Sequence, residues 1–154
     1  MAGQNRLEVE VVKAVRAPVV PAFARSVLER AASLPELVAR LPAETATVAV
    51  RITSDEELRR LNRSYAGNDS VTDVLSFAGS ENHLGDLAIS WPMVERQAVQ
   101  YGQPVLTEVA LLCVHGMLHL LGWDHVSASE RREMSRLTVA ALKLSGLRLA
   151  PRRL

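Results

Sequence analysis

The stretch His115-Gly-Met-Leu-His119-Leu-Leu-Gly-Trp-Asp-His125 holds three of the chain's four histidines. Positions i and i+4 of an α-helix lie on one face, so His115 and His119 can direct ring nitrogens at a common point. Gly122 follows the last apolar turn and favours a left-handed helix stop, after which the chain can reverse and bring back His125. The spacing therefore predicts a metal site made by one helix and the bend behind it.

The three nitrogens indicate what kind of metal site this is. They leave the fourth position of a tetrahedral ion open to water, which is typical of a catalytic zinc rather than a structural one. Zinc lowers the pKa of bound water to about 7 and makes hydroxide available at neutral pH. The alternative is a helix whose histidines are satisfied core residues. Because three histidines cluster, we favour the metal site and expect one Zn²⁺ per chain.

The same spacing occurs in the metzincin peptidases, which carry a glutamate directly after the first histidine as general base. In this chain that position is Gly116, which has no group that can move a proton. The metal ligands are kept and the peptidase base is missing, so the sequence disfavours a peptidase.

The motif HGMLHLLGWDH closely resembles the HGxLHLxGxDH signature of the YbeY endoribonucleases, also called rRNA maturation factors. Three further blocks stand in the order and spacing of that family: LNRSY at 61–65, TDVLSF at 72–77 and LGDLAIS at 84–90. The resemblance runs from about Val48 to Leu144. It implies a zinc-dependent endoribonuclease that cuts single-stranded RNA in late ribosomal RNA maturation, at the 16S 3′ end, and in ribosome quality control.

The resemblance also implies partners, location and layout. The partners are ribosomal RNA and the small ribosomal subunit, with a ribosomal protein or a GTPase as a further candidate, and the location is the cytoplasm. The layout is zincin-like, with the metal helix against a sheet. The RNA substrate follows from the resemblance alone, and no catalytic side chain is assigned.

One position departs from the family pattern. The family usually has an arginine directly after the tyrosine of the LNxxY block, where it is thought to serve RNA binding and cleavage, but Ala66 follows Tyr65 here. Arg59 and Arg63, earlier in the same expected helix, are candidates for RNA contact. The departure supports an alternative function, a metal-stabilised ribosome-assembly or RNA-binding factor that cuts nothing.

Two aspartates are candidates for orienting a ligand imidazole from the second shell of the metal. Asp124 adjoins His125, and Asp86 follows a glycine at the start of an expected strand. For both residues a role in a turn is equally open. Glu108 lies two helical turns before His115 on the same face, and we interpret it as a residue of the site's rim.

Three other side chains receive structural interpretations. His83 lies in a polar loop outside the histidine cluster and is expected to be a solvated surface side chain. Trp123 stands where the family usually has tyrosine; it could stack on an RNA base, but packing beside Gly122 is favoured. Cys113 faces away from His115 on the helix and is interpreted as a packed thiol.

Composition bounds the class of protein. The 154 residues are 48% apolar and 23% charged, with a net charge of +1, too small to indicate a nucleic-acid binder by itself. We expect one domain over residues 1–154, a metal-dependent hydrolase. No run reaches the roughly 18 apolar residues of a membrane span, and the start of the chain lacks a signal pattern. A single cysteine fits a reducing cytoplasm.

Periodicity predicts the elements. Alternating or β-branched stretches indicate strands at 7–12, 45–53, 74–78 and 84–90. Helical patterns with capping residues indicate helices at 21–33, 54–65, 90–102, 104–122 and 127–144, with a short helical turn between Pro35 and Pro42. The sequence therefore predicts an α+β fold in which a small, mostly four-stranded mixed sheet packs on helices.

Overall fold

The computed structural model describes residues 6–66 and 72–154. The elements are β1 (Leu7–Lys13), α1 (Pro21–Ala31), α2 (Pro35–Val38), β2 (Ala46–Thr53), α3 (Asp55–Ala66), β3 (Val74–Ala78), β4 (His83–Ser90), α4 (Trp91–Tyr101), α5 (Val105–Leu120) and α6 (Ala128–Lys143). The four strands form one sheet in the order β1-β2-β4-β3. The pairs β1–β2 and β2–β4 are parallel and β3–β4 is antiparallel, so the predicted α+β class with a four-stranded mixed sheet is confirmed.

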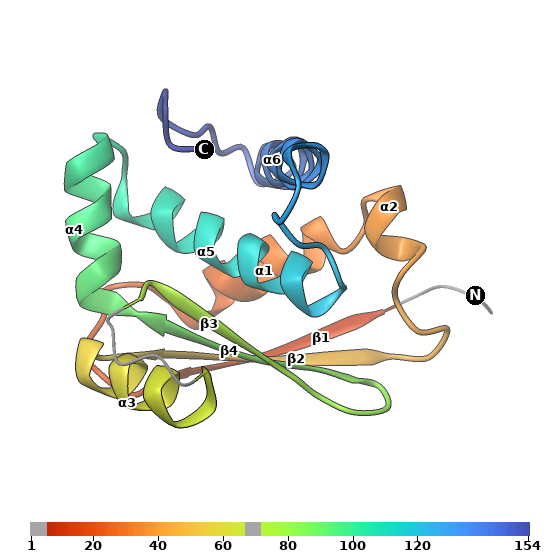
Figure 1. Cartoon of the computed structure of the whole chain (residues 1–154), viewed down its shortest axis with the longest axis horizontal. Helices are drawn as coiled ribbons and strands as arrows, with labels where there is room; N and C mark the ends of the chain where they lie inside the picture. The colour runs from red at the N-terminus through yellow and green to blue at the C-terminus, as the bar shows by residue number, and fades with distance from the viewer. Residues whose placement is uncertain (1–5, 67–71) are drawn as a thin grey trace.

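The helices cover the two faces of the sheet unequally (Figure 1). On one face α1 packs against β1, and α5 packs against β3 and β4. The other face carries α3, which contacts β3 and β4, while α4 rises from one end of the sheet. Helix α6 packs on α5 and α1 as an outer layer, so α5 lies between the sheet and α6.

Helix α5 is the central helix of the core. Its buried apolar residues surround nearly the whole helix: Val109, Ala110, Leu111, Leu112, Cys113, Val114, Met117 and Leu118. A helix that is apolar on all sides is stable only when it is covered on all sides, and a helix held in this way is a rigid mount for the polar side chains it carries. No single helix in the described ranges is long and apolar enough to cross a membrane. Helices α4 and α5 together reach the required length and apolar composition, but the chain bends by 115° at their junction.

Local sequence signals set where the helices begin and end. Ser54, Ser90 and Ser127 each accept a hydrogen bond from the backbone N–H three residues later, at 3.1, 3.2 and 3.1 Å. These bonds satisfy donors that have no partner within the helix, which is why serine is favoured at that position. Helix α5 ends at Leu120, and Gly122 has a φ of 96°, as the predicted helix stop requires.

Gly116 marks a close approach of α5 to the sheet. A Cβ atom at this position would lie 2.7 Å from Cδ2 of Leu87, a buried residue of β4. The Gly116 carbonyl accepts a hydrogen bond from the Ser76 hydroxyl of β3 at 3.3 Å. Helix and sheet therefore meet so closely that a side chain at position 116 fits only if Leu87 moves.

We expect Gly116→Ala to destabilise the protein. Alanine favours a helix over glycine by about 1 kcal/mol, but overpacking a core costs about 1–3 kcal/mol, so we expect a net loss of about 1 kcal/mol in denaturant unfolding. Leu87→Ala should cost less stability in the Gly116→Ala background than in the wild type, because the new methyl group would fill part of the vacated space. A stabilising Gly116→Ala would contradict the close approach.

Candidate metal centre

The structure brings the three histidines of the predicted site together. The ring centroids of His115 and His119 lie 5.0 Å apart, and that of His125 lies 5.8 Å from the first and 5.1 Å from the second. One ring nitrogen from each residue lies within 4.8 Å of the other two, so the group could hold a metal ion. Metal–nitrogen bonds are about 2.0–2.1 Å long for zinc, and small ring rotations would let the three nitrogens share one ion.

Backbone contacts on both sides hold the bend that carries His125. The N–H of Trp123 donates to the carbonyl of Leu118 at 3.0 Å and closes the end of α5. The Asp124 carboxylate then accepts a hydrogen bond from the backbone N–H of His125 at 2.7 Å, and the Arg131 guanidinium of α6 donates to the His125 carbonyl at 3.3 Å. The third histidine is exposed, but its backbone is fixed by these two contacts.

The electrostatics of the cluster favour neutral rings. Burial lowers the pKa of His115 to about 4, and the neighbouring His119 adds to this effect while Asp73 opposes it. Burial also lowers the pKa of His119, with a further contribution from His125. A neutral imidazole keeps the lone pair that a metal needs, so His115 and His119 are ready to bind an ion at pH 7 without losing a proton.

The histidines line a cavity of about 600 Å³ between α5, β3 and the C-terminal tail. Its polar side chains include Asp73 and Ser76 from the β3 side and Arg153 from the tail, and leucines of α5 and β3 form much of the rest of the wall. Sequence reasoning gave no role to Asp73, although it lies in the TDVLSF block. It also missed Arg153, which no local pattern marks.

A family model described as endoribonuclease YbeY matches residues 13–146, most of the chain. The chain belongs to the YbeY family. Relatives that carry the name endoribonuclease YbeY include one from Chloroflexus aggregans, 46% identical over 112 residues (65% of this chain and 72% of the relative), and one from Roseiflexus castenholzii, 42% identical over 113 residues (64% and 71%). The solution structure of TM1509 from Thermotoga maritima shares the fold, with a TM-score of 0.59 at 22% identity over 88% of this chain and 90% of that one.

Asp86 does not lie at the histidine cluster of this YbeY-family chain. Leu87 faces α5, and neighbouring strand residues point to opposite faces, so Asp86 points to the other side of the sheet. There its carboxylate pairs with Nε2 of His83 at 3.1 Å. The interpretation of Asp86 as a residue that orients a ligand imidazole is therefore wrong, because β4 turns this carboxylate toward the face that carries α3.

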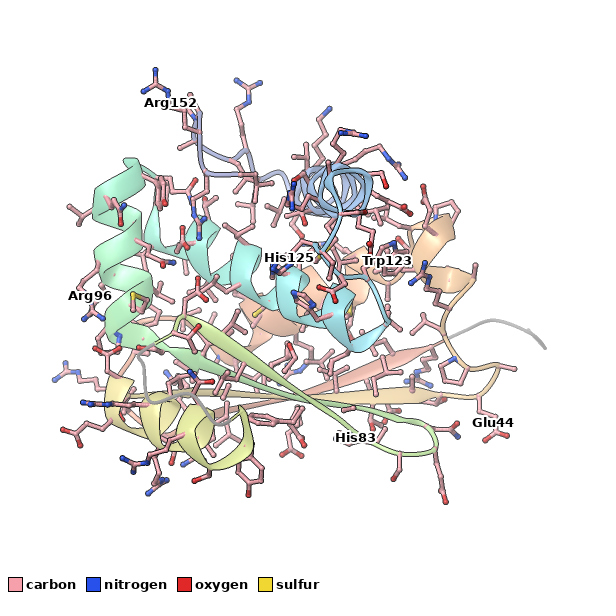
Figure 2. The ribbon with its side chains drawn as sticks, in the orientation of Figure 1. Glu44, His83, Arg96, Trp123, His125 and Arg152 are labelled. Carbon is pink, nitrogen blue, oxygen red and sulfur yellow. The ribbon has the colours of Figure 1, made fainter. Side chains whose placement is uncertain are left out.

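His83 lies outside the cluster, as predicted, but it is not simply a solvated side chain. It is the first residue of β4 and is partly buried, and its Nδ1 is 2.7 Å from the Thr47 hydroxyl of β2. Figure 2 shows His125 on the α5 side of the sheet and His83 beside the β3–β4 hairpin. The contact with Thr47 ties the hairpin end of β4 to β2, and the contact with Asp86 lies within β4.

Trp123 takes the packing role. Its side chain is only 5% exposed, its Nε1 donates to the Glu133 carboxylate at 3.1 Å, and the Arg40 guanidinium lies 3.6 Å over the ring. A ring covered in this way cannot stack on an RNA base. Figure 2 places Trp123 beside the bend, between α6 and α2. Cys113 is likewise buried, as predicted, and burial raises the pKa of its thiol to about 12.

Asp124 accepts the hydrogen bond from the His125 backbone, and its negative charge acts to raise the pKa of His119, so a role in orienting a ligand imidazole stays a prediction beside the turn role. The interpretation of Glu108 as a rim residue is wrong, because its side chain is fully buried. The carboxylate accepts hydrogen bonds from Gln97 at 2.8 Å and Gln103 at 2.7 Å, and it pairs with Arg153 at 2.6 Å. The tail covers this face of α5, which helical periodicity alone cannot reveal.

The arginines proposed for RNA contact lie on α3, across the sheet from the histidines (Figure 1). Arg59 and Arg63 are exposed there, and neither lines the cavity. Ala66 is the last residue of α3, but its side chain and residues 67–71, where we expect a loop, lie outside the described part of the chain. A role of Arg59 and Arg63 in RNA contact stays a prediction.

The metal-free protein is expected to lose stability as the pH falls from about 6.5 to about 4. The unfolded chain protonates His115 near its ordinary pKa of 6.5, whereas the folded protein resists protonation of this residue down to about 4. The unfolded state therefore binds more protons in this window, and the loss attributable to His115 is on the order of 3 kcal/mol.

Denaturant unfolding in the presence of a chelator, at pH values from 7.5 to 4, measures this loss. The His115→Gln variant, whose side chain does not titrate, should show a shallower dependence of its unfolding free energy on pH. Equal slopes for the two proteins would show that the folded state does not hold His115 in its neutral form.

Proposed function

We propose that this chain is a zinc-dependent endoribonuclease that cuts single-stranded RNA. The observation that carries the proposal is the convergence of His115, His119 and His125 on an open cavity of about 600 Å³. The cavity also presents a carboxylate, Asp73, and a guanidinium, Arg153. The name endoribonuclease YbeY, carried by the relatives, supports RNA as the substrate.

The donor set fits the proposed ion. Three neutral imidazoles suit zinc better than calcium or magnesium, which prefer oxygen ligands. When bound, zinc supplies a Lewis acid for a phosphoryl oxygen and an acidic water near neutral pH. We propose all three histidines as its ligands, at one ion per chain within one domain spanning residues 1–154.

The chain's own residues would then act from fixed positions. The buried helix α5 holds His115 and His119, and the bend holds His125 through its backbone contacts. Asp73 is the acidic side chain that lines the cavity among the described residues, so it is placed to accept a proton from an attacking hydroxyl group. The leucines of the wall keep the reacting phosphate partly shielded from bulk water, which strengthens these interactions.

We further propose the cellular setting that the resemblance implies. The substrate would be ribosomal RNA, cut in late maturation at the 16S 3′ end and in ribosome quality control, in the cytoplasm. The small ribosomal subunit, and a ribosomal protein or a GTPase, would be the partners. These proposals rest on membership of the YbeY family and on no contact in the structure.

The second candidate is a ribosome-assembly or RNA-binding factor that is stabilised by its metal and cuts nothing. Ala66, in place of the family arginine, favours it, as does a net charge of only +1. Both functions need the histidine cluster, so only an assay for RNA cleavage separates them.

Protein purified without chelators is expected to contain about one zinc ion per chain, as measured by elemental analysis. An ion held at a hundred times its dissociation constant adds about 2.7 kcal/mol of stability, so a chelator should lower Tm by roughly 5–10 °C. His119→Ala should melt at the same temperature with and without chelator. A stoichiometric metal that survives in His119→Ala would place the ion elsewhere.

Metal-loaded protein is expected to cut a short single-stranded oligoribonucleotide, with products separated on a denaturing gel. Because a metal contributes several kcal/mol of transition-state stabilisation, His119→Ala should cut about a thousandfold more slowly. The matched control is His83→Gln, which changes the one histidine outside the site and should keep wild-type activity. Equal cleavage by wild type and His119→Ala would indicate a contaminating nuclease and favour the non-catalytic factor.

A further inference from the structure

Arg153 is held in the wall of the cavity by a side-on ion pair. Its Nε donates to Oε1 of Glu108 at 3.0 Å and its Nη2 donates to Oε2 at 2.6 Å. The guanidinium also lies over the ring of Tyr101, with Cζ 4.6 Å from the ring centroid. The side chain is only 12% exposed. A long, flexible side chain is thus fixed in one position before any ligand arrives.

The tail that carries Arg153 is itself anchored to the corner between α4 and α5. The backbone N–H of Ala150 donates to Oε1 of Gln103 at 2.9 Å, and Nε2 of the same Gln103 donates to Glu108 at 2.7 Å. Gln97 of α4 donates to both Glu108 and Asp73, at 2.8 and 3.3 Å. The side-chain amide of Gln97 therefore links the ion pair of Glu108 and Arg153 to Asp73, which lines the cavity together with the histidines.

The ion pair does not use all the donors of Arg153. A guanidinium has five N–H groups, and Nη1 donates to none of the described residues. No polar side-chain atom in the described part of the chain is buried without a partner, so Nη1 reaches solvent, and the open space that Arg153 lines is the cavity. Among the described residues it is the one lysine or arginine that lines this cavity.

We propose that Arg153 is the phosphate-binding residue of the site, donating from Nη1 to a phosphate oxygen of the RNA strand beside the histidines. The proposal rests on the function proposed above. A planar guanidinium group that is already oriented loses little conformational entropy when it binds, so an arginine held in this way is well suited to donate hydrogen bonds to a phosphate group. Glu108 positions the guanidinium and does not itself contact the RNA.

A purely structural role for the ion pair makes a different prediction. If Arg153 served only to neutralise the buried Glu108, breaking the pair from either end would impair RNA binding equally. If Arg153 binds phosphate, the two ends have different effects. Glu108→Gln keeps an oxygen that can accept a hydrogen bond from Arg153 and removes a negative charge, so the loss of orientation is offset by a more positive potential at the phosphate. Arg153→Gln removes the group that contacts the phosphate.

The test measures RNA affinity with metal-free protein, so that it does not depend on cleavage. The probe is a fluorescein-labelled single-stranded oligoribonucleotide with 2′-O-methyl riboses, followed by fluorescence anisotropy over a range of salt concentrations. Loss of one charge-assisted hydrogen bond to phosphate should weaken binding by Arg153→Gln about tenfold or more. The slope of log K against log salt should become shallower by about 0.7.

Arg152→Gln is the matched control, because it removes the same charge from the neighbouring position. Arg152 is exposed and points away from the molecule (Figure 2), and we expect its affinity to change by less than about twofold. Glu108→Gln should bind the probe at least about as tightly as wild type, because the loss of orientation of Arg153 is offset by the loss of a negative charge. Because Arg153→Gln leaves a buried carboxylate without its partner, the double variant Glu108→Gln/Arg153→Gln is included, and it should bind as weakly as Arg153→Gln.

Equal affinities for Arg153→Gln and Arg152→Gln would overturn the inference, and so would equal losses in Glu108→Gln and Arg153→Gln. Absence of RNA binding by the wild type would overturn it as well. A failure of the proposed nuclease function would give a different pattern of results. If the expected order of affinities holds but metal-loaded wild type does not cut RNA, the phosphate site stands and the nuclease does not.

Discussion

The site depends on the burial of α5 between the sheet and α6. Burial on all sides removes the freedom of a surface helix to bend or fray, and so fixes the direction of the two imidazoles that it carries. The same burial lowers the pKa of His115 and keeps its ring neutral. One hydrophobic interaction therefore supplies both the geometry and the protonation state that metal binding needs.

Around this helix the polar groups form a connected system rather than isolated contacts. Gln97 joins Asp73 to Glu108, and Glu108 in turn holds Arg153. A buried carboxylate is costly unless it is paired and fully hydrogen-bonded, and here two amides and a guanidinium meet that requirement. The buried carboxylate of Glu108 thus fixes the orientation of the Arg153 guanidinium in the wall of the cavity, although the chain as a whole carries almost no net charge.

The sequence predicts those features of the fold and the site that depend on residues close together in the chain. The histidines four residues apart, the serine caps and the alternating strands each follow from contacts within about one helical turn or one strand. The convergence of His125 was also predictable, because Gly122 permits the reversal.

Other features depend on contacts between segments far apart in the chain. The burial of Glu108 depends on Arg153, 45 residues away, and the basic tail carries no periodicity that places it. The direction of Asp86 depends on which face of the sheet receives α5 and which receives α3. Strand alternation tells which residues share a face, but not which face carries the histidines.

The close approach at Gly116 also bears on how this site could change in evolution. In peptidases with the same histidine spacing, the following position carries the general base, and here a Cβ atom at that position would lie 2.7 Å from the Leu87 side chain. A glutamate there would require the Leu87 side chain to move and the packing of α5 on β4 to adjust. A path toward peptidase chemistry would therefore need a second change in the neighbouring strand, so this side-chain contact opposes it.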